Sequence, residues 1–509
     1  MHPGGFIILD FGSQFTQLIA RRLREFGVFS EILPFDYDLE EVKKHRPSGI
    51  ILSGGPFSVE DPIAPFREDL AELNEIAPLL GVCYGMQLVA KVFGGQVLAA
   101  GKREYGLNKV KWRVPLGGVS EEQNVWMSHG DYVARPPKGF QVIAESEAGH
   151  PAAMVSDRIW CYQFHPEVSH TEDGDQLLKA FVFDHCKAEA NWKAKNIVQE
   201  LVENIRELVP EGDDVLCALS GGVDSTVVGV LLTKALGAKR VHCVFVDNGL
   251  LRQNEFNEVL AMYYSMGLNV KGVEASETFL NSLKGVSDPE KKRKIIGHTF
   301  IDVFKTALEG VGPLQWLAQG TLYPDVIESV SLRGKSVTIK SHHNVGGLPE
   351  DLNLKLVEPL RELFKDEVRA IGEELGISHD RLWRHPFPGP GLGIRVLGEI
   401  NKEKLDVLRK ADAIYIEELK KGQLYDKIWQ AFCVLLPVQT VGVQGDNRTY
   451  ENALAIRAVT SRDGMTADWY SFEPDFLRRL SNRITNEVPG VNRVVYDITS
   501  KPPGTIEWE

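Results

Sequence analysis

Short apolar runs alternate along the chain with glycine turns and amphipathic helices, and this alternation leaves few folds open to it. The runs at 6–9, 49–52 and 79–82 are apolar throughout, which is typical of strands buried on both faces. Apolar residues at helical spacing follow the first run over residues 14–26. Because strands that alternate with helices usually pair in parallel, we predict a mostly parallel sheet with helices on both faces.

The same order begins again near Ile197, after a polar stretch over 187–196 that we interpret as a linker. A predicted strand over 214–219 leads through a glycine turn into a predicted helix over 226–236. A further strand is expected over 241–246. The sequence therefore predicts a second α/β region.

A third region is expected after the segment 385–391, which holds three prolines and two glycines and cannot continue a helix. We therefore predict an α/β protein of three domains, over residues 1–190, 191–384 and 385–509. The first two are expected to be doubly wound, mostly parallel-sheet domains. The third is expected to be a smaller α+β domain.

Charge and cysteine usage exclude several classes of partner. The net charge is −13, whereas nucleic-acid binding needs clustered Lys and Arg, so we expect no nucleic-acid partner. The one tight basic run, 291–294, is either a solvated charge run or a contact for a small phosphate ligand. The six cysteines form no C-x-x-C pair, which argues against disulfides and zinc and indicates a cytoplasmic protein. No apolar stretch is long enough to cross a membrane, so no membrane contact is expected.

The segment Gly81-Val82-Cys83-Tyr84-Gly85 has the spacing of a nucleophile elbow, in which glycines let a strand turn sharply into a helix. Free N–H groups and the positive dipole end at the start of that helix favour a thiolate. The alternative is a buried structural cysteine. His165 and Glu167, which follow a later strand, favour catalysis, because a cysteine nucleophile needs a base and the base needs an orienting carboxylate.

With these motifs in this order, the first region resembles the class I glutamine amidotransferases. The resemblance implies that Cys83 is the nucleophile. It further implies that His165 is the general base and that Glu167 orients it.

Two more features of the first region match the same family. The turn Ser53-Gly54-Gly55-Pro56 is similar to the family's oxyanion loop. The backbone N–H groups of Gly55 and Tyr84 are therefore expected to hold the oxyanion. His129 and Asp131 also match, and we interpret them as part of a structured loop near the glutamine pocket.

The segment Ser220-Gly221-Gly222-Val223-Asp224-Ser225 lies between a predicted strand and a predicted helix, where backbone N–H groups can close around phosphate oxygens. It lacks the residue order of a Walker A loop, and a chance glycine turn is the alternative. The segment resembles the S-G-G-x-D-S signature of the ATP pyrophosphatases. That resemblance implies ATP cleavage between the α- and β-phosphates. It also implies a set of ATP-binding residues: Ser220, Gly221, Gly222, Val223, Asp224, Ser225, Thr226, Val246 and Asp247.

Segments 319–325 and 339–344 are similar to the lid of the same family. The resemblance implies that several lid residues lie near the phosphates: Asp325, Glu328, Lys340, His342 and His343. It also implies that Asp224 and Asp325 hold Mg²⁺. Taken alone, an Asp or Lys in a loop is more often exposed to solvent.

The stretch 492–509, which closes on Ile-Glu-Trp-Glu, resembles the ending of the GMP synthetases. The resemblance implies a homodimer formed through this region. It also implies candidates for contact with the nucleotide substrate: Arg293, Gln430, Arg493, Lys501, Ile506 and Glu507. Arg and Lys suit a 5′-phosphate, and a carboxylate can accept from the ribose or purine. A hydrophobic dimer strand with charged edges is an alternative that could hold alongside.

Together the resemblances imply an enzyme of the GMP synthetase family. Such a ligase makes ammonia from L-glutamine and uses ATP to install it on xanthosine 5′-monophosphate (XMP), giving GMP, AMP and pyrophosphate. One alternative is an ATP pyrophosphatase that amidates or thiolates another substrate; RNA thiolation would need a basic face and relay cysteines. The other alternative is a non-catalytic glutamine or nucleotide sensor. The presence of Cys83, His165 and the full 220–225 loop argues against it.

Overall fold

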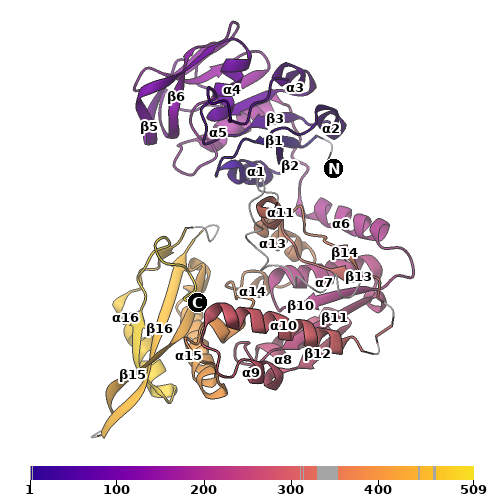
Figure 1. The fold of residues 1–509 in the computed structure, drawn as a ribbon, viewed down its shortest axis with the longest axis vertical. Helices are drawn as coiled ribbons and strands as arrows, with labels where there is room; N and C mark the ends of the chain where they lie inside the picture. The colour runs from indigo at the N-terminus through magenta and orange to yellow at the C-terminus, as the bar shows by residue number, and fades with distance from the viewer. Residues whose placement is uncertain are drawn as a thin grey trace. The chain divides into compact units, whose positions relative to one another are not determined.

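The computed structural model describes residue 2 and residues 4–309, 311–312, 314–329, 354–444, 447–461 and 466–509. The chain forms two compact units. The first consists mainly of residues 1–197, and the second mainly of residues 198–325 and the described residues from 354 onward. Figure 1 labels the helices and strands of both units.

A nine-stranded sheet forms the centre of the first unit, in the order β2-β1-β3-β4-β9-β8-β7-β5-β6. Its strands are β1 (Phe6–Asp10), β2 (Ser30–Pro34), β3 (Gly49–Leu52), β4 (Leu79–Val82), β5 (Gln96–Trp112), β6 (Glu122–Arg135), β7 (Gln141–Ser146), β8 (Pro151–Val155) and β9 (Ile159–Tyr162). The five strands from β2 to β9 pair in parallel, and the remaining pairs are antiparallel. The strands predicted at 6–9, 49–52 and 79–82 are β1, β3 and β4 of the parallel half.

Helices follow the strands of the parallel half, and they bury their apolar faces against the sheet. They are α1 (Thr16–Glu25), α2 (Leu39–His45), α3 (Leu70–Ile76) and α4 (Tyr84–Val92), and after β9 come α5 (Gly174–Lys179) and a π-helical turn, Ala180–His185. Ile19 and Leu23 lie one turn apart on α1 and are buried. One apolar core includes Ile7 of β1, Leu79 of β4 and Met86 of α4, and so joins the strands to the helices.

The centre of the second unit is a wholly parallel sheet of five strands, in the order β12-β11-β10-β13-β14. Its strands are β10 (Val215–Leu219), β11 (Val241–Asp247), β12 (Val270–Glu274), β13 (Trp316–Ala318) and β14 (Lys355–Val357). The helices of this part are α6 (Ala194–Leu208), α7 (Val223–Leu236), α8 (Glu255–Ser265), α9 (Ser276–Ser282), α10 (Pro289–Ala307), α11 (Tyr323–Ser329), α13 (Lys365–Glu374) and α14 (His379–Leu382). The helix predicted over 226–236 is α7, which begins three residues earlier, within the glycine turn itself.

The C-terminal part of the second unit combines helices with a mainly antiparallel sheet. Its elements are α15 (Lys402–Lys421), β15 (Gln430–Gln444), β16 (Asn447–Thr460), β17 (Asp468–Trp469), α16 (Pro474–Glu487) and β18 (Val491–Tyr496). Strand β16 pairs antiparallel with β15 and β17, and parallel with β18. One apolar core contains Leu216 of β10, Phe304 of α10, Leu405 of α15, Leu435 of β15 and Leu480 of α16. The regions before and after residue 385 therefore share one core, which accounts for their grouping as a single compact unit.

The predicted fold class is confirmed: the chain is an α/β protein with two large parallel or mixed sheets and a C-terminal α+β part. A strand pair was expected over 152–156 and 159–164 and is confirmed as β8 and β9, but β5, β6 and β7 were not anticipated. A signal is present in β6, where Val125, Met127 and His129 are buried while Trp126 and Ser128 are less so. This alternation is the period of a strand with two unlike faces. None of the helices in the described ranges is long and apolar enough to cross a membrane.

The junction between β4 and α4 requires glycine on steric grounds. A Cβ placed on Gly85 would lie 2.3 Å from the carbonyl oxygen of Leu52, and one placed on Gly81 would lie 2.8 Å from the backbone of Gly85. The start of α4 is therefore pressed directly against β3 and β4.

We predict that Gly85→Ala destabilises the first unit by about 1–3 kcal/mol, because the added methyl group forces a backbone shift. The measurement is the thermal unfolding transition of that unit by calorimetry. Gly101→Ala is the matched control, because a Cβ at Gly101 meets nothing within 4 Å. An equal effect of the two substitutions would contradict the steric argument.

Candidate active sites

Cys83 occupies the turn between β4 and α4 in a strained backbone conformation. Its φ is 53° and its ψ is −107°, a combination that L-residues adopt only where the surrounding structure enforces it. The Cys83 N–H donates to the carbonyl of Tyr162 at 2.8 Å, and the Gly85 N–H donates to the carbonyl of Ser53 at 3.1 Å. These bonds to β9 and to the 53–56 turn hold the elbow in place.

His165 and Glu167 lie beside Cys83 and are almost fully buried, at 3% and 1% exposure. The distance between His165 Nδ1 and Glu167 Oε1 is 2.8 Å, and Cys83 Sγ donates to the backbone carbonyl of Ser128 at 3.7 Å. The backbone carbonyl of His165 accepts from Thr171 Oγ1 at 2.6 Å, and the Phe15 ring packs edge-on against the imidazole. The structure thus pairs the imidazole with the carboxylate, and the Cys83 side chain lies near enough to influence the pKa of His165.

The imidazole of this cluster carries its proton at neutral pH. Burial alone would lower the pKa of His165, but Glu167 and the Cys83 sulfur together raise it to about 10. An imidazolium beside a sulfur favours the thiolate, which is the nucleophilic form of cysteine.

The two predicted oxyanion donors lie at the same junction. Tyr84 is the first residue of α4, so its N–H is one of the four that a helix leaves without an internal partner. Gly55 passes close by: a Cβ there would lie 2.7 Å from the Phe11 carbonyl oxygen and 3.3 Å from the Tyr84 ring. The Tyr84 hydroxyl donates to the Pro65 carbonyl at 2.6 Å, and burial raises the pKa of Tyr84 to about 12. The phenol is therefore packed away from the chemistry.

His129 and Asp131 belong to a polar cluster on β6 next to the cysteine. His129 Nδ1 lies 2.9 Å from the Asp131 carbonyl oxygen, and its Nε2 lies 3.4 Å from the carboxylate of Glu104, which is also buried. Gln87 donates to the same carbonyl at 2.9 Å. Sequence reasoning missed Glu104 and Gln87. Only Gln87 had a signal, because it lies one helical turn after Cys83.

The 220–225 loop joins β10 to α7, as predicted. Gly221 has a φ of +75°, which favours glycine. The Ser220 N–H donates to Ser225 Oγ at 3.1 Å, and Thr226 Oγ1 donates to the Gly222 carbonyl at 2.7 Å. The helix begins at Val223, so the N–H groups of its first turn are available to an anion. Val246 and Asp247 end the adjacent strand β11, where the Asp247 carboxylate accepts from the Gly249 N–H at 2.9 Å.

Asp224 forms an ion pair that sequence reasoning did not find. Lys365 Nζ lies 2.5 and 2.6 Å from the two carboxylate oxygens of Asp224. Lys365 is the first residue of α13 and lies 141 positions away in sequence, so no local pattern could reveal the contact.

The predicted lid residues lie only partly within the described structure. The Asp325 carboxylate accepts from the Leu322 N–H at 3.0 Å at the start of α11. Lys340, His342, His343 and the side chain of Glu328 lie outside the described residues. Within the ranges that the structure describes, no group of three or more His, Cys, Asp or Glu is placed to hold a metal ion.

The candidates for nucleotide contact fall into separate groups. Gln430 Nε2 donates to Glu507 Oε1 at 2.7 Å, and Arg395, which is fully buried, binds the same carboxylate at 2.7 and 3.1 Å. Ile506 packs into a small apolar core with Phe432. Sequence reasoning missed Arg395.

The other three candidates lie apart from that cluster. Arg293 Nη2 donates to the backbone oxygen of Glu509 at 2.6 Å. Arg493 is exposed on β18, and Lys501 exchanges backbone hydrogen bonds with Ala467.

The basic run 291–294 is not a wholly solvated run of charges, because one of its residues is buried. Lys292 is fully buried, and its Nζ lies 2.5 Å from the Glu509 carboxylate and 2.8 Å from the Val396 carbonyl oxygen. Its ammonium group therefore has internal partners, as a buried charge requires.

Comparison with known proteins gives a match along the whole chain. A family model for class-I glutamine amidotransferases matches residues 7–185, one for NAD synthase matches residues 194–296, and one for the GMP synthase C terminal domain matches residues 417–508. A protein of Bdellovibrio bacteriovorus named GMP synthase (glutamine-hydrolyzing) is 65% identical over 505 residues, which cover 99% of this chain and all of the relative. Proteins of the same name from Pelodictyon phaeoclathratiforme and Aquifex aeolicus are 56% and 55% identical, with 99% of each chain covered.

We predict that Glu167→Gln lowers the pKa of His165 from about 10 toward its ordinary value of 6.5 or below. The neutral amide no longer favours the imidazolium, while burial continues to oppose it. Nitrogen-15 chemical shifts of labelled histidine, followed over pH, would report the change. Glu172→Gln is the control, because the Glu172 carboxylate binds Asn124. A His165 pKa that stays near 10 in Glu167→Gln would refute the ion pair.

Proposed function

Because this chain belongs to the family of glutamine-hydrolysing GMP synthases, we propose that its cysteine elbow and its 220–225 loop serve two halves of one reaction. The chain is a carbon–nitrogen ligase that takes its amide nitrogen from glutamine, uses ATP and converts XMP to GMP. The observation that supports the residue assignment is the buried pair His165 and Glu167, whose imidazole also responds to the charge of Cys83. The relatives' identity over the full chain length leaves no support for a thiolating enzyme or a sensor.

In the glutamine half, the Cys83 thiolate attacks the side-chain amide carbon. The N–H groups of Gly55 and Tyr84 stabilise the oxyanion of the tetrahedral intermediate. His165 gives its proton to the departing ammonia, and the acyl group remains on sulfur as a thioester. His165 then takes a proton from water, which attacks the thioester and releases glutamate, while Glu167 keeps the imidazole oriented.

In the synthetase half, the N–H groups at the start of α7 bind the β- and γ-phosphates of ATP. The predicted ATP contacts Ser220–Thr226, Val246 and Asp247 lie at the carboxyl ends of β10 and β11, the usual ligand edge of such a sheet. The 2-oxygen of XMP attacks the α-phosphate and pyrophosphate leaves. Ammonia then adds to the adenylylated carbon and displaces AMP, giving GMP.

Magnesium fits the donor set at this loop. Asp224 and Asp325 offer carboxylate oxygens, and Mg²⁺ is usually held by one or two carboxylates together with substrate phosphates. When bound, the ion neutralises phosphate charge. Lys365, which contacts both oxygens of Asp224, must yield one of them for such binding. Glu328, Lys340, His342 and His343 are proposed to close over the phosphates.

The nucleotide substrate is proposed to bind the C-terminal part. Glu507, held by Gln430 and Arg395, accepts hydrogen bonds from the ribose or purine, and Ile506 packs beside it. Arg293, Arg493 and Lys501 are proposed to bind the 5′-phosphate.

The assembly is proposed to be a cytoplasmic homodimer formed through residues 385–509. Support comes from exposed apolar side chains on the hairpin of β15 and β16: Val438, Val441, Val443 and Tyr450. By function the chain is proposed to divide into residues 1–190, 191–384 and 385–509.

We predict that Cys83→Ala abolishes glutamine-driven GMP formation and leaves ammonia-driven formation intact. Glutamine-driven turnover should fall by several orders of magnitude, as on removal of a catalytic nucleophile. The assay is GMP production with glutamine or with concentrated ammonium chloride at mildly alkaline pH, where free ammonia is available.

Asp224→Asn is the reciprocal control, because the loss of loop chemistry should remove synthesis with both donors. Product analysis should show AMP and pyrophosphate. A folded Cys83→Ala variant that loses both activities equally would refute the division of labour, and one that loses neither would show that Cys83 is not the nucleophile.

A further inference from the structure

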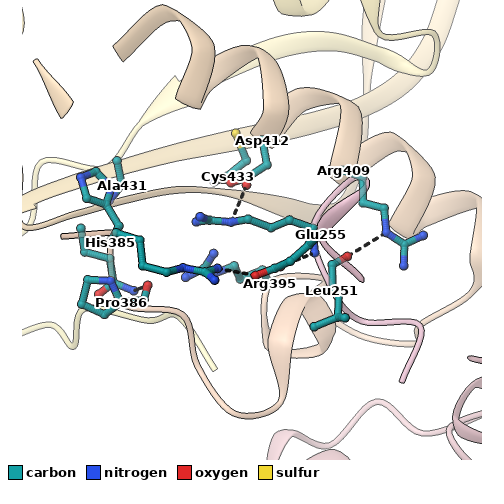
Figure 2. A network of polar contacts seen from close by, with 12 residues as sticks. Leu251, Glu255, His385, Pro386, Arg395, Arg409, Asp412, Ala431 and Cys433 are labelled. Atoms are coloured by element: carbon teal, nitrogen blue, oxygen red, sulfur yellow. Dashed lines mark hydrogen bonds and ion pairs between the residues drawn. The ribbon is translucent and has the colours of Figure 1, made fainter. Parts of the chain in front are cut away.

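Three consecutive residues, Arg384, His385 and Pro386, contact both the 220–225 loop and strand β15. We call residues 384–386 the linking segment. It follows α14, and its last two residues open the segment 385–391 that is rich in proline and glycine. Figure 2 shows His385 and Pro386 within a network of polar contacts that also contains Glu255 and Asp412.

Arg384 binds the loop end of this network. Its Nη1 donates to the Gly221 carbonyl at 2.8 Å, and its Nη2 pairs with the buried carboxylate of Glu255. Burial alone would raise the pKa of Glu255, but Arg384 and the other guanidinium nearby lower it, so the pair is ionic at neutral pH. The guanidinium thus holds the carbonyl at the one loop position whose φ is positive, +75°. With that carbonyl fixed, the N–H groups that follow remain directed toward the phosphate position.

His385 and Pro386 bind the strand end of the network. His385 Nδ1 accepts from the Ala431 N–H at 3.2 Å, and its Nε2 donates to the Tyr425 carbonyl at 2.9 Å. Burial lowers the pKa of His385 to about 4, so the imidazole is neutral, and these two bonds fix its tautomer. The Pro386 carbonyl accepts from Gln430 Nε2 at 3.2 Å.

Gln430 completes the connection to the nucleotide cluster. The amide group that donates to Pro386 also donates to Glu507 at 2.7 Å. A ligand that binds Gln430 therefore contacts a side chain that is hydrogen-bonded to the linking segment. A ligand that binds Glu507 contacts the partner of that side chain. The hydrogen bond between Arg384 and Gly221 joins two residues that are 163 positions apart in the sequence.

A second set of contacts runs beside the first. The Glu255 carboxylate accepts from the Arg252 N–H at 3.0 Å, and the Arg252 guanidinium lies 3.0 Å from the Asp412 carboxylate. Asp412 in turn accepts from the Cys433 N–H on β15 at 3.2 Å. Glu255, the partner of Arg384, is thereby also connected to β15, so two sets of contacts run from Arg384 to this strand.

We propose that Arg384 is a positioning residue that couples XMP binding at Gln430 and Glu507 to the phosphate-binding conformation of the 220–225 loop. This rests on the proposed assignment of those two residues to the nucleotide substrate. Both ligands favour the same arrangement of the linking segment, so the first ligand to bind stabilises the arrangement that the second one needs. Such coupling is reciprocal: each ligand tightens the other by the same factor.

The test is calorimetric titration of the full chain with magnesium adenosine 5′-(α,β-methylene)triphosphate, which cannot be cleaved between its α- and β-phosphates. Titrations are made without XMP and with saturating XMP. In the wild type, XMP should tighten binding of the analogue by roughly fivefold or more, the lower end of measured couplings. In Arg384→Gln the factor should fall to about one, while the affinity for XMP alone stays within about twofold of wild type.

Arg381→Gln is the matched control, since it removes the same charge from α14 three residues away and should keep the wild-type factor. Arg384→Gln leaves the Glu255 carboxylate buried without its partner, so the double variant Arg384→Gln/Glu255→Gln is measured as well, and it should also show a factor of about one. An unchanged factor in either folded variant, or no coupling in the wild type, overturns the proposal. The substrate assignment fails separately if Gln430→Leu binds XMP alone as tightly as the wild type.

Discussion

The proposed chemistry of the chain depends on one backbone constraint: a helix that follows a parallel strand leaves its first N–H groups without partners inside the helix. Cys83 precedes α4 and the 220–225 loop precedes α7. At both places a helix leaves its first N–H groups without a partner inside the helix, and we propose that they serve a developing oxyanion in one case and phosphate in the other. Glycine is required at each place for a different reason. At Gly85 the backbone lies too close to Leu52 for a side chain, and at Gly221 the φ angle is positive.

Charge from distant parts of the chain completes each junction. Glu167 holds the proton on His165 beside the cysteine, and Lys365 neutralises Asp224 beside the loop. Arg384 brings its charge to the loop in a different way, through the carbonyl of Gly221. Burying an unpaired charge is far more costly than burying a paired one, so Glu167 fixes the position of the buried His165 as well as its ionisation. The same logic explains why Lys292, fully buried in the second unit, is surrounded by a carboxylate and carbonyl oxygens.

The separation in sequence between two contacting residues determines whether the sequence alone could predict their contact. The strands at 49–52 and 79–82 were placed to the residue, because a buried parallel strand has a continuous apolar signature. The elbow, the 220–225 loop and the pair His165 and Glu167 were also found, since each is a short local pattern. Lys365, Arg384 and Arg395 were not found, because their partners lie 141, 163 and 112 positions away and a lone cation carries no local signature. Strands β5, β6 and β7 were missed because only the apolar runs were considered, and the alternation in β6 was not.

The distribution of cores sets which parts can influence one another through direct contact. The cysteine, its base and its orienting carboxylate are supported by the core of the first unit, which includes Tyr84 and Met86. The 220–225 loop and the nucleotide cluster are supported by the second, whose core runs from Leu216 of β10 to Leu480 of α16. Within that second unit, the linking segment 384–386 contacts the loop at one end and strand β15 at the other. A structural change at either end therefore affects a hydrogen bond of this segment. The proposed sites therefore place ammonia production in one compact unit, and the binding of both nucleotides in the other.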